Sequence, residues 1–271
     1  MPSNLSPKLR FALTLLLCLC SSRLIAQTVI PLPAHSHNDY ERTRPLFSAL
    51  QLRFASVEAD VYLIDGELQV GHDRGDLMPG RTLGNLYLEP LRLIVTRGVG
   101  QVYPETTTPL ILLVDIKTEA ESTYQALERA LAPYERFLTR FTPQSTELGA
   151  VTVVVSGNRP LDIMANQPER FAGYDGRLTD LTSGQVDSNL MPIISNDWDE
   201  VFSWRGGEPM PDDQRLQLHT LANLARENGV KLRFWNTPDI PPVWEALYEA
   251  EVDLINVDRI DAFSEFFSSG R

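Results

Sequence analysis

Short apolar runs recur along this chain, and several of them are followed by segments with helical spacing. Seven runs are typical of buried β-strands: Ile30–His35, Ala55–Leu63, Leu110–Lys117, Ala150–Ser156, Met191–Ser195, Lys231–Trp235 and Val252–Val257. Gly173–Leu178 is a weaker strand candidate. Glu67–Gly71 follows an Asp-Gly turn and therefore predicts the second arm of a hairpin.

Helical spacing predicts three helices between these runs, over Thr118–Phe137, Asp212–Asn228 and Val243–Glu251. Gly229 is a C-terminal signal for the second helix, and Pro241-Pro242 opens the third. Strands that alternate with helices predict an α/β protein with a mostly parallel sheet. About eight such units in this length favour a (β/α)8 TIM barrel over an open sheet. No repeat or linker divides residues 27–271, so we expect a single domain.

The N-terminal residues have the pattern of a secretory signal peptide. Lys8 and Arg10 precede an apolar run over residues 11–20, and cleavage after Ala26 would remove residues 1–26. A bilayer-spanning helix needs about 20 apolar residues, so this run predicts no stable membrane span. We expect an exported protein, periplasmic or secreted. A lipid anchor on Cys18 or Cys20 and an N-terminal core helix are the alternatives.

Composition excludes several classes of protein. A hydrophobic content of 43% is sufficient for a packed core and excludes wholesale disorder. Two cysteines, both in the predicted leader, cannot form a disulfide scaffold or a four-cysteine zinc site. A net charge of -12 argues against nucleic acid as a partner, because binding to phosphate backbones requires a basic surface.

Polar residues interrupt the apolar runs where barrel active sites form, at the C-terminal ends of strands. These residues are His35, His37, Glu58, Asp60, His72, Asp115 and Lys117. Glu58 and Asp60 are two apart and project to the same face of a strand, where two carboxylates would repel each other without a cation. With Asp115 they offer an oxygen-rich site that favours Mg²⁺ or Ca²⁺ over zinc. The alternative is a solvated face of an edge strand.

Three of the four histidines lie close in sequence to these acidic residues. Imidazole titrates near neutrality, so a histidine can take a proton from an attacking hydroxyl and give one to a leaving oxygen. A single histidine is more often a loop residue bonded to backbone, but His35, His37 and His72 together predict a joint site. His219 lies within a predicted helix and is interpreted as structural.

The ordered motifs AHSHNDYERTRPLF, SVEADVYLIDGELQVGHD, LLVDIK and VTVVVSGNRP resemble the PLC-like phosphodiesterase superfamily. That superfamily includes glycerophosphodiester phosphodiesterases and phosphatidylinositol-specific phospholipases C. The resemblance is greatest to the branch of the fungal "altered inheritance of mitochondria" proteins, and it extends from about Ala34 to Asp258. It implies a TIM barrel, a divalent cation and hydrolysis of a phosphodiester.

The resemblance also implies roles for individual residues. His35 matches the first catalytic histidine, and His72 matches the second in the His-Asp element. Lys117 matches a phosphate-facing lysine, and Trp235 resembles the aromatic residue near the substrate. The metal-binding carboxylates correspond to Glu58, Asp60 and Asp115.

Two departures from the family pattern affect these assignments. The first motif reads His-Ser-His-Asn-Asp where glycerophosphodiesterases have His-Arg-Gly, so a phosphate-binding arginine is missing there and His37 is a rival for the catalytic role. The third carboxylate is Asp115 where those enzymes usually have Glu. Arg159, just after a strand, could supply the missing phosphate contact, or it could be a salt-bridged arginine at the start of a helix.

The sequence therefore predicts a phosphoric diester hydrolase that needs Mg²⁺ or Ca²⁺ and acts on a small-molecule or lipid phosphodiester. A metal-dependent amidohydrolase is an alternative, because His35-x-His37 and Asp258 end the first and last strands. A non-catalytic barrel that binds a phosphorylated ligand is another. A glycosidase is disfavoured, because Glu58 and Asp60 on one strand are too close to flank a sugar bond.

Overall fold

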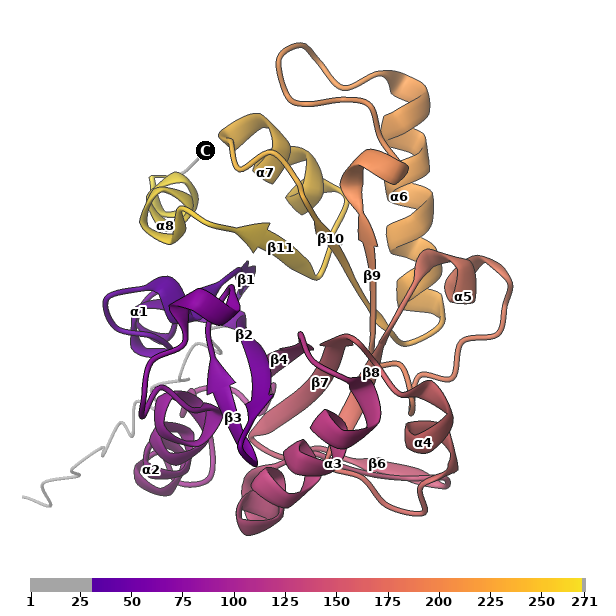
Figure 1. Ribbon diagram of the computed structural model, residues 1–271. Coiled ribbons are helices and arrows are strands. Elements are labelled where there is room, and N and C mark those ends of the chain that lie inside the picture. The colour runs from indigo at the N-terminus through magenta and orange to yellow at the C-terminus, as the bar shows by residue number, and fades with distance from the viewer. Residues whose placement is uncertain (1–30, 270–271) are drawn as a thin grey trace, which may run out of the picture.

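The computed structural model describes residues 31–269, and the predicted signal peptide and its cleavage site lie outside this range. Within it, eight parallel strands close into a barrel (Figure 1). Around the barrel they are β1 (Leu32–Ser36), β2 (Phe54–Ile64), β4 (Leu110–Ile116), β7 (Val151–Gly157), β8 (Ala172–Gly176), β9 (Ile193–Asp197), β10 (Lys231–Trp235) and β11 (Leu254–Val257). β1 pairs with both β2 and β11, which closes the sheet and confirms the predicted TIM barrel.

The hairpin predicted after the second strand is present. β3 (Glu67–Val70) runs antiparallel to β2 and extends the sheet outside the barrel. Asp65 and Gly66 connect the two strands, and both have positive φ angles, of 50° and 86°. These angles match the two-residue turn that an Asp-Gly pair favours. The hairpin carries the chain back toward the rim of the barrel, where His72 follows directly.

Helices surround the barrel in Figure 1. They are α1 (Phe47–Gln51), α2 (Glu89–Arg97), α3 (Ala120–Leu131), α4 (Leu161–Asn166), α5 (Leu178–Thr182), α6 (Asp212–Glu227), α7 (Pro241–Glu249) and α8 (Ile260–Ser268). A small hairpin of β5 (Arg140–Thr142) and β6 (Ser145–Glu147) lies before β7. None of the helices within residues 31–269 has both the length and the apolar character needed to cross a membrane.

The structure corrects some predicted boundaries. The helix predicted over Thr118–Phe137 is α-helical only to Leu131 and continues as a 3₁₀ helix over Ala132–Phe137, because Pro133 cannot extend the α-helical hydrogen bonds. The weak strand Gly173–Leu178 ends at Gly176, since Leu178 begins α5. The sequence analysis did not predict α2, α8 or the shorter helices, although α2 and α8 are amphipathic.

The barrel interior is apolar at one end and polar at the other. Five inward-facing side chains near the N-terminal ends of the strands form a small apolar cluster: Ile111, Leu113, Val154, Ile193 and Leu254. Further along the same strands the inward positions become polar, because strand side chains alternate and Asp115 follows Leu113 on one face. The cluster fills the barrel near the N-terminal ends of the strands, and the polar side chains lie at the C-terminal ends.

We predict that Leu113→Ala destabilises the fold, because Leu113 is fully buried in this cluster. Loss of its methyl groups and the cavity left behind should lower the free energy of unfolding by about 2–5 kcal/mol. Urea denaturation measures this quantity. Leu216→Ala is the matched control, since Leu216 is 69% exposed on α6 and its change should stay within about 0.5 kcal/mol. Equal effects of the two substitutions would show that the cluster is not part of the stabilising core.

Candidate active site

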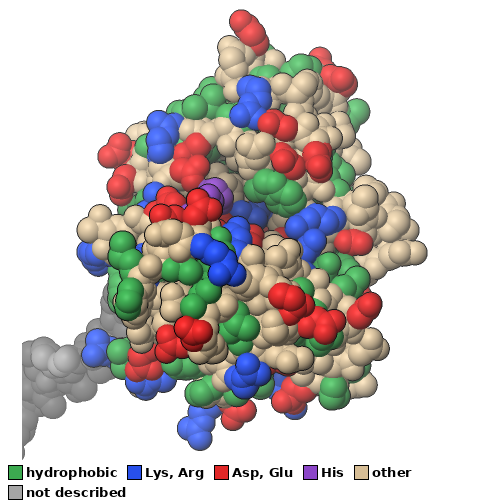
Figure 2. Space-filling model, viewed as in Figure 1, with side chains coloured by type: hydrophobic (Ala, Val, Ile, Leu, Met, Phe, Trp, Pro, Cys, Tyr) green, Lys and Arg blue, Asp and Glu red, His purple; other side chains and the backbone are tan. Residues whose placement is uncertain are grey.

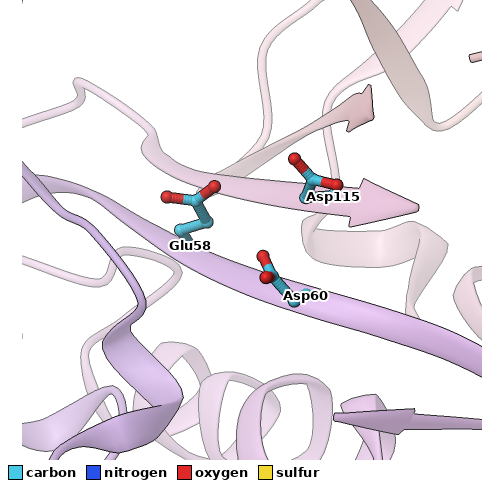
Figure 3. Close-up of side chains that lie close together, drawn as sticks. All are labelled: Glu58, Asp60 and Asp115. Carbon is cyan, nitrogen blue, oxygen red and sulfur yellow. The ribbon is translucent and has the colours of Figure 1, made fainter. Parts of the chain in front are cut away.

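Three carboxylates converge inside the C-terminal end of the barrel. Glu58 and Asp60 lie on β2, and Asp115 lies on the adjacent strand β4, in register with Asp60. One oxygen of each carboxylate lies within 4.8 Å of an oxygen of the other two. Figure 3 shows the three side chains pointing into one space between the two strands. The sequence prediction that these residues face one another agrees with this geometry.

The electrostatics of this trio fit a bound cation. Burial, together with the negative charge of Glu58, raises the pKa of Asp60 to about 6, and burial also raises the pKa of Asp115. Asp60 Oδ1 is buried and has no hydrogen-bond partner among residues 31–269. A buried oxygen without a partner is costly, and a cation between the carboxylates would satisfy it.

Gly157, at the end of β7, lets the neighbouring strand approach the trio. Its φ of +68° is in the left-handed region. A Cβ atom at this position would lie 2.2 Å from Asp115 Oδ1 and 2.5 Å from the carbonyl oxygen of Ile116. Only glycine therefore leaves room for the carboxylate at this edge of the site.

Lys117 supplies positive charge to two members of the trio. Its ammonium nitrogen lies 3.0 Å from Asp60 Oδ2 and 3.1 Å from Asp115 Oδ1. Burial alone would lower the pKa of Lys117, but the charges of Asp115 and Asp60 raise it above its usual value. Lys117 therefore remains an ammonium group and faces the same cavity as the carboxylates.

His35 is fully buried inside the barrel and does not line the cavity. Its Nδ1 lies 2.8 Å from Ser56 Oγ, and its Nε2 lies 3.0 Å from Glu58 Oε2. Burial, and then the charge of Arg233, lowers the pKa of His35 to about 4. The ring is therefore neutral, both of its nitrogens are engaged, and it holds Glu58 in position.

Arg233 is a second buried partner of Glu58, and sequence reasoning missed it. Its guanidinium lies 3.3 Å from Glu58 Oε2 and donates to Asn256 Oδ1 at 2.7 Å. Although burial raises the pKa of Glu58, Arg233 and His35 hold that pKa well below its usual value. The alternation of Lys231, Arg233 and Trp235 in β10 was the signal that could have placed Arg233 on the inner face.

His37 lines the cavity just beyond the end of β1. Its Nδ1 lies 2.7 Å from Asp258 Oδ1, and its Nε2 lies 3.9 Å from Glu58 Oε2. Burial lowers the pKa of His37, but the hydrogen bond to Asp258 and the charge of Glu58 outweigh burial and raise it. The ring is thus oriented by Asp258 so that Nε2 faces the carboxylates. The sequence left His35 and His37 as rivals, and it is His37 that reaches the cavity.

His72 lies on the other side of Asp60, at the exposed rim. Its Nδ1 is 3.2 Å from the Tyr40 hydroxyl and 3.6 Å from Asp60 Oδ2. Burial and the charge of Asp60 raise the pKa of Tyr40 well above its usual value, so the hydroxyl stays protonated and donates to Asp60 Oδ2 at 2.9 Å. The Tyr62 hydroxyl donates to the backbone carbonyl of His72 at 2.9 Å, which fixes the loop.

A buried carboxylate holds the loop that carries Tyr40. Asp39 Oδ1 accepts from Ser36 Oγ at 2.9 Å, and its Oδ2 accepts from the Tyr87 hydroxyl at 3.0 Å and from the Leu46 N–H. Leu46 has a φ of +65°, an unfavourable angle for a branched side chain. These hydrogen bonds stabilise the strained turn and keep Tyr40 against Asp60.

Arg177 and Trp235 also line the cavity, as do Asn38, Ser156 and Arg233. Arg177 is paired with the fully buried Asp175 at 3.0 Å, and its guanidinium lies 4.8 Å from the centre of the Trp235 ring. Asp175 also accepts from Ser156 Oγ at 2.8 Å and from Ser195 Oγ at 2.6 Å. Trp235 was predicted from the resemblance, and its place near a substrate stays a prediction, whereas Arg177 was not predicted because it follows a weak strand signal.

The cavity has a volume of about 240 Å³. Figure 2 shows acidic, basic and histidine side chains gathered around a hollow in this face of the molecule. Arg159 does not line this cavity. Its guanidinium lies 4.8 Å from the Tyr174 ring centre and donates to the backbone carbonyl of Asp175, and it borders an adjoining groove. His219 lies on α6 and does not line this cavity.

The arrangement predicted for an amidohydrolase is not present in the described residues. Within 31–269, Glu58, Asp60 and Asp115 are the group of three or more ligand-type side chains whose atoms could hold a metal. His35 is bonded to Ser56 and Glu58, and His37 to Asp258, so the two rings do not converge on one ion. The oxygen-only trio favours a hard divalent cation over zinc.

Comparisons with known proteins identify the family. The family model described as "AIM6-like phosphodiesterase domain" matches residues 23–175 of this chain. Altered inheritance of mitochondria protein 6 homolog from Arthroderma benhamiae is 31% identical, over 90% of this chain and 86% of the relative. Altered inheritance of mitochondria protein 6 from Eremothecium gossypii is 32% identical, over 86% of this chain and 68% of the relative.

A solved structure shares the fold. The crystal structure of a glycerophosphodiester phosphodiesterase from Parabacteroides distasonis superposes with a TM-score of 0.53 at 13% identity, over 88% of this chain and 98% of that chain. At this identity the likeness concerns the TIM barrel alone. The family match over residues 23–175 and the extent of the sequence match to the relatives show that the chain belongs to the AIM6-like phosphodiesterase family.

Proposed function

We propose that this protein is a metal-dependent phosphoric diester hydrolase with His37 and His72 as its acid–base pair. One observation carries the proposal: three carboxylates within 4.8 Å of one another border a cavity that is also lined by two histidines and a lysine. The family description and the shared barrel fold support the same reaction class. Glycerophosphodiesters and phospholipid-like diesters are the two substrate groups that the proposal covers.

Glu58, Asp60 and Asp115 would hold one Mg²⁺ or Ca²⁺ ion, since all three offer carboxylate oxygens. When bound, such an ion offsets negative charge on a phosphate oxygen. His35 and Arg233 keep Glu58 ionised and fixed in place, and Tyr40 donates to Asp60. The chain thus presets the orientation of two of the three ligands.

Besides Arg233, which is bound to Glu58, Lys117 and Arg177 are the cavity-lining cations that can contact the phosphate. Both line the cavity, Lys117 beside the carboxylates and Arg177 against Trp235. A planar guanidinium can donate two hydrogen bonds to a phosphate. Arg177 therefore supplies from the end of β8 the group that the first motif of this chain lacks.

The two histidines can divide the proton transfers. Asp258 and Tyr40 engage the Nδ1 atoms of His37 and His72, so Nε2 of each ring is the nitrogen that exchanges a proton. One ring takes the proton of the attacking hydroxyl as its oxygen bonds to phosphorus. The other gives a proton to the alcohol oxygen as its bond to phosphorus breaks. With water as the nucleophile, the products are a phosphomonoester and an alcohol.

Export through the predicted signal peptide would place this reaction outside the cytoplasm, and it stays a prediction. N-terminal sequencing of the mature protein from its native host tests it. A first residue at Gln27 is the expected result, whereas retention of Met1 would contradict export by cleavage.

Removal of the divalent ion is expected to destabilise the folded protein. Saturation with Mg²⁺ or Ca²⁺ at 100 times Kd adds about 2.7 kcal/mol, which should raise Tm by about 5 °C in a domain of this size. Differential scanning fluorimetry with and without EDTA measures the shift. Asp115→Asn should abolish it, whereas Asp261→Asn, at an exposed position on α8, should retain it. If neither Mg²⁺ nor Ca²⁺ raises the Tm, the proposed metal site is contradicted.

Loss of either cavity histidine is expected to abolish most of the turnover. His37→Ala and His72→Ala should each lower kcat on a glycerophosphodiester with an alkyl alcohol as the leaving group by about 10²–10⁴-fold, the usual contribution of a general acid or base. His219→Ala is the control and should keep full activity with the same circular dichroism spectrum. Normal turnover in His37→Ala or His72→Ala would overturn the assignment. Tight binding of the diester by the wild type without turnover would instead support a non-catalytic barrel.

Asp258 is expected to act as a positioning residue through His37. Asp258→Asn keeps the shape of the side chain but removes the charge that orients the ring, so kcat should fall by about 10²-fold with little change in KM. Asp261→Asn serves again as the control. A change in KM alone would show that Asp258 affects substrate binding and not the orientation of His37.

A further inference from the structure

A groove adjoins the catalytic cavity and has no role in the chemistry described so far. Its volume is about 870 Å³, and it is more open to solvent than the cavity. Lys117 and Gly157 line both spaces. A diester whose phosphate lies beside Lys117 can therefore extend one of its two alcohol arms into the groove.

The groove is lined mainly by hydroxyl, amide and cationic groups. Its polar lining consists of Arg74, Thr118, Glu119, Ser122, Thr123, Asn158 and Arg159, in addition to Lys117. Leu63 and Ala120 are the apolar side chains among the described lining residues. An acyl chain gains little from such a surface, because hydrophobic stabilisation depends on the apolar area removed from water.

Two guanidinium groups border the groove without a carboxylate partner. Within residues 31–269, no ion pair joins Arg74 or Arg159 to an acidic side chain, and Asp175 is paired with Arg177 instead. Arg74 is exposed, with its guanidinium 5.9 Å from the centre of the Tyr62 ring. Arg159 is half-buried, and its Nε atom is buried without a hydrogen-bond partner.

Glu119 is the acidic side chain of this lining, and its charge is already engaged. One of its carboxylate oxygens accepts from the Glu121 N–H at 3.0 Å, and the other accepts from the Ser122 N–H at 2.8 Å. It thus caps the N-terminus of α3, where a negative charge is favourable. Lys117 is paired with Asp60 and Asp115, so it is the two arginines that outweigh Glu119 and leave the groove with an excess of positive charge.

We propose that the groove binds an anionic arm of the substrate. This inference rests on the proposed function and narrows its substrate to water-soluble phosphodiesters in which one alcohol carries a carboxylate or a second phosphate. Arg74 and Arg159 contact that anion, while the phosphate that is cleaved lies beside Lys117. The arrangement disfavours diesters with a cationic arm, such as choline, and diesters with acyl chains.

The experiment compares p-nitrophenyl phosphodiesters that differ only in the second alcohol: glycolate, ethanol and choline. At low salt the purified full chain should cleave the glycolate diester with a kcat/KM about tenfold above that of the ethanol diester, since each partly exposed ion pair contributes up to about a factor of five. The choline diester should be the poorest substrate. The preference for glycolate should shrink in 0.5 M NaCl, because salt screens exposed charges.

Two variants assign the preference to the groove. Arg74→Gln should reduce the glycolate preference by about threefold without changing turnover of bis(p-nitrophenyl) phosphate, and adding Arg159→Gln should remove most of the rest. Arg97→Gln, at an exposed position on α2, is the control and should keep the full preference. Because Arg74 is exposed, its variant tests the inference even if Arg159→Gln does not fold.

The outcomes separate this inference from the proposed function. If bis(p-nitrophenyl) phosphate is cleaved with neither Mg²⁺ nor Ca²⁺, both the proposed function and the anion subsite are overturned. Cleavage with equal kcat/KM for the three diesters, or a preference that Arg74→Gln leaves unchanged, overturns the subsite alone. Faster cleavage of a long-chain phospholipid in mixed micelles than of the glycolate diester also overturns it.

Discussion

Mutual repulsion among three closely spaced carboxylates is the constraint on which the rest of the site depends. Ligand atoms of Glu58, Asp60 and Asp115 lie within 4.8 Å of one another, and the first two side chains are buried. Such a group is unstable unless positive charge or hydrogen-bond donors surround it. Many of the polar side chains around the cavity supply this positive charge or these hydrogen-bond donors.

The three carboxylates receive unequal numbers of these stabilising partners. Glu58 has two buried partners, His35 and Arg233, and is the member whose pKa is held low. Asp60 receives a hydrogen bond from Tyr40 and the charge of Lys117, yet its pKa is still raised and its Oδ1 is left without a partner. The chain therefore compensates one end of the trio fully and leaves a deficit of positive charge at the other, where the phosphate and a cation are proposed to bind.

The features that depend on the alternation of side chains along a strand could be predicted from the sequence. The alternation in β2 placed Glu58 and Asp60 on one face, and the strongly apolar β4 located Asp115 beside them. The eight strand signals were enough for the barrel, whose closure brings β1 against β11. Arg233 could not be assigned to Glu58 in this way, since 175 residues separate them in sequence and only closure of the barrel brings them together.

The choice between His35 and His37 shows a second limit of sequence reasoning. His35 and His37 are separated by one residue at the end of the same strand. Alternation of side chains alone would therefore place both rings on the inner face of the barrel. The difference arises because β1 ends at Ser36, after which the chain turns into the loop held by Asp39. His35 stays within the barrel under Glu58, whereas His37 lies at the rim against Asp258, from the last strand.

Closure of the barrel also explains how a missing residue in one motif can be replaced from elsewhere. The first motif of this chain has no arginine beside its histidine, but the C-terminal ends of all eight strands meet around one cavity. Arg177 reaches that cavity from the end of β8, four strands away from β1 in either direction around the barrel. A guanidinium needs only to reach the phosphate, and the strand that carries it is unimportant. Under the proposed function, a guanidinium from β8 would therefore contact a phosphate in the cavity although the first motif of this chain carries no arginine beside its histidine.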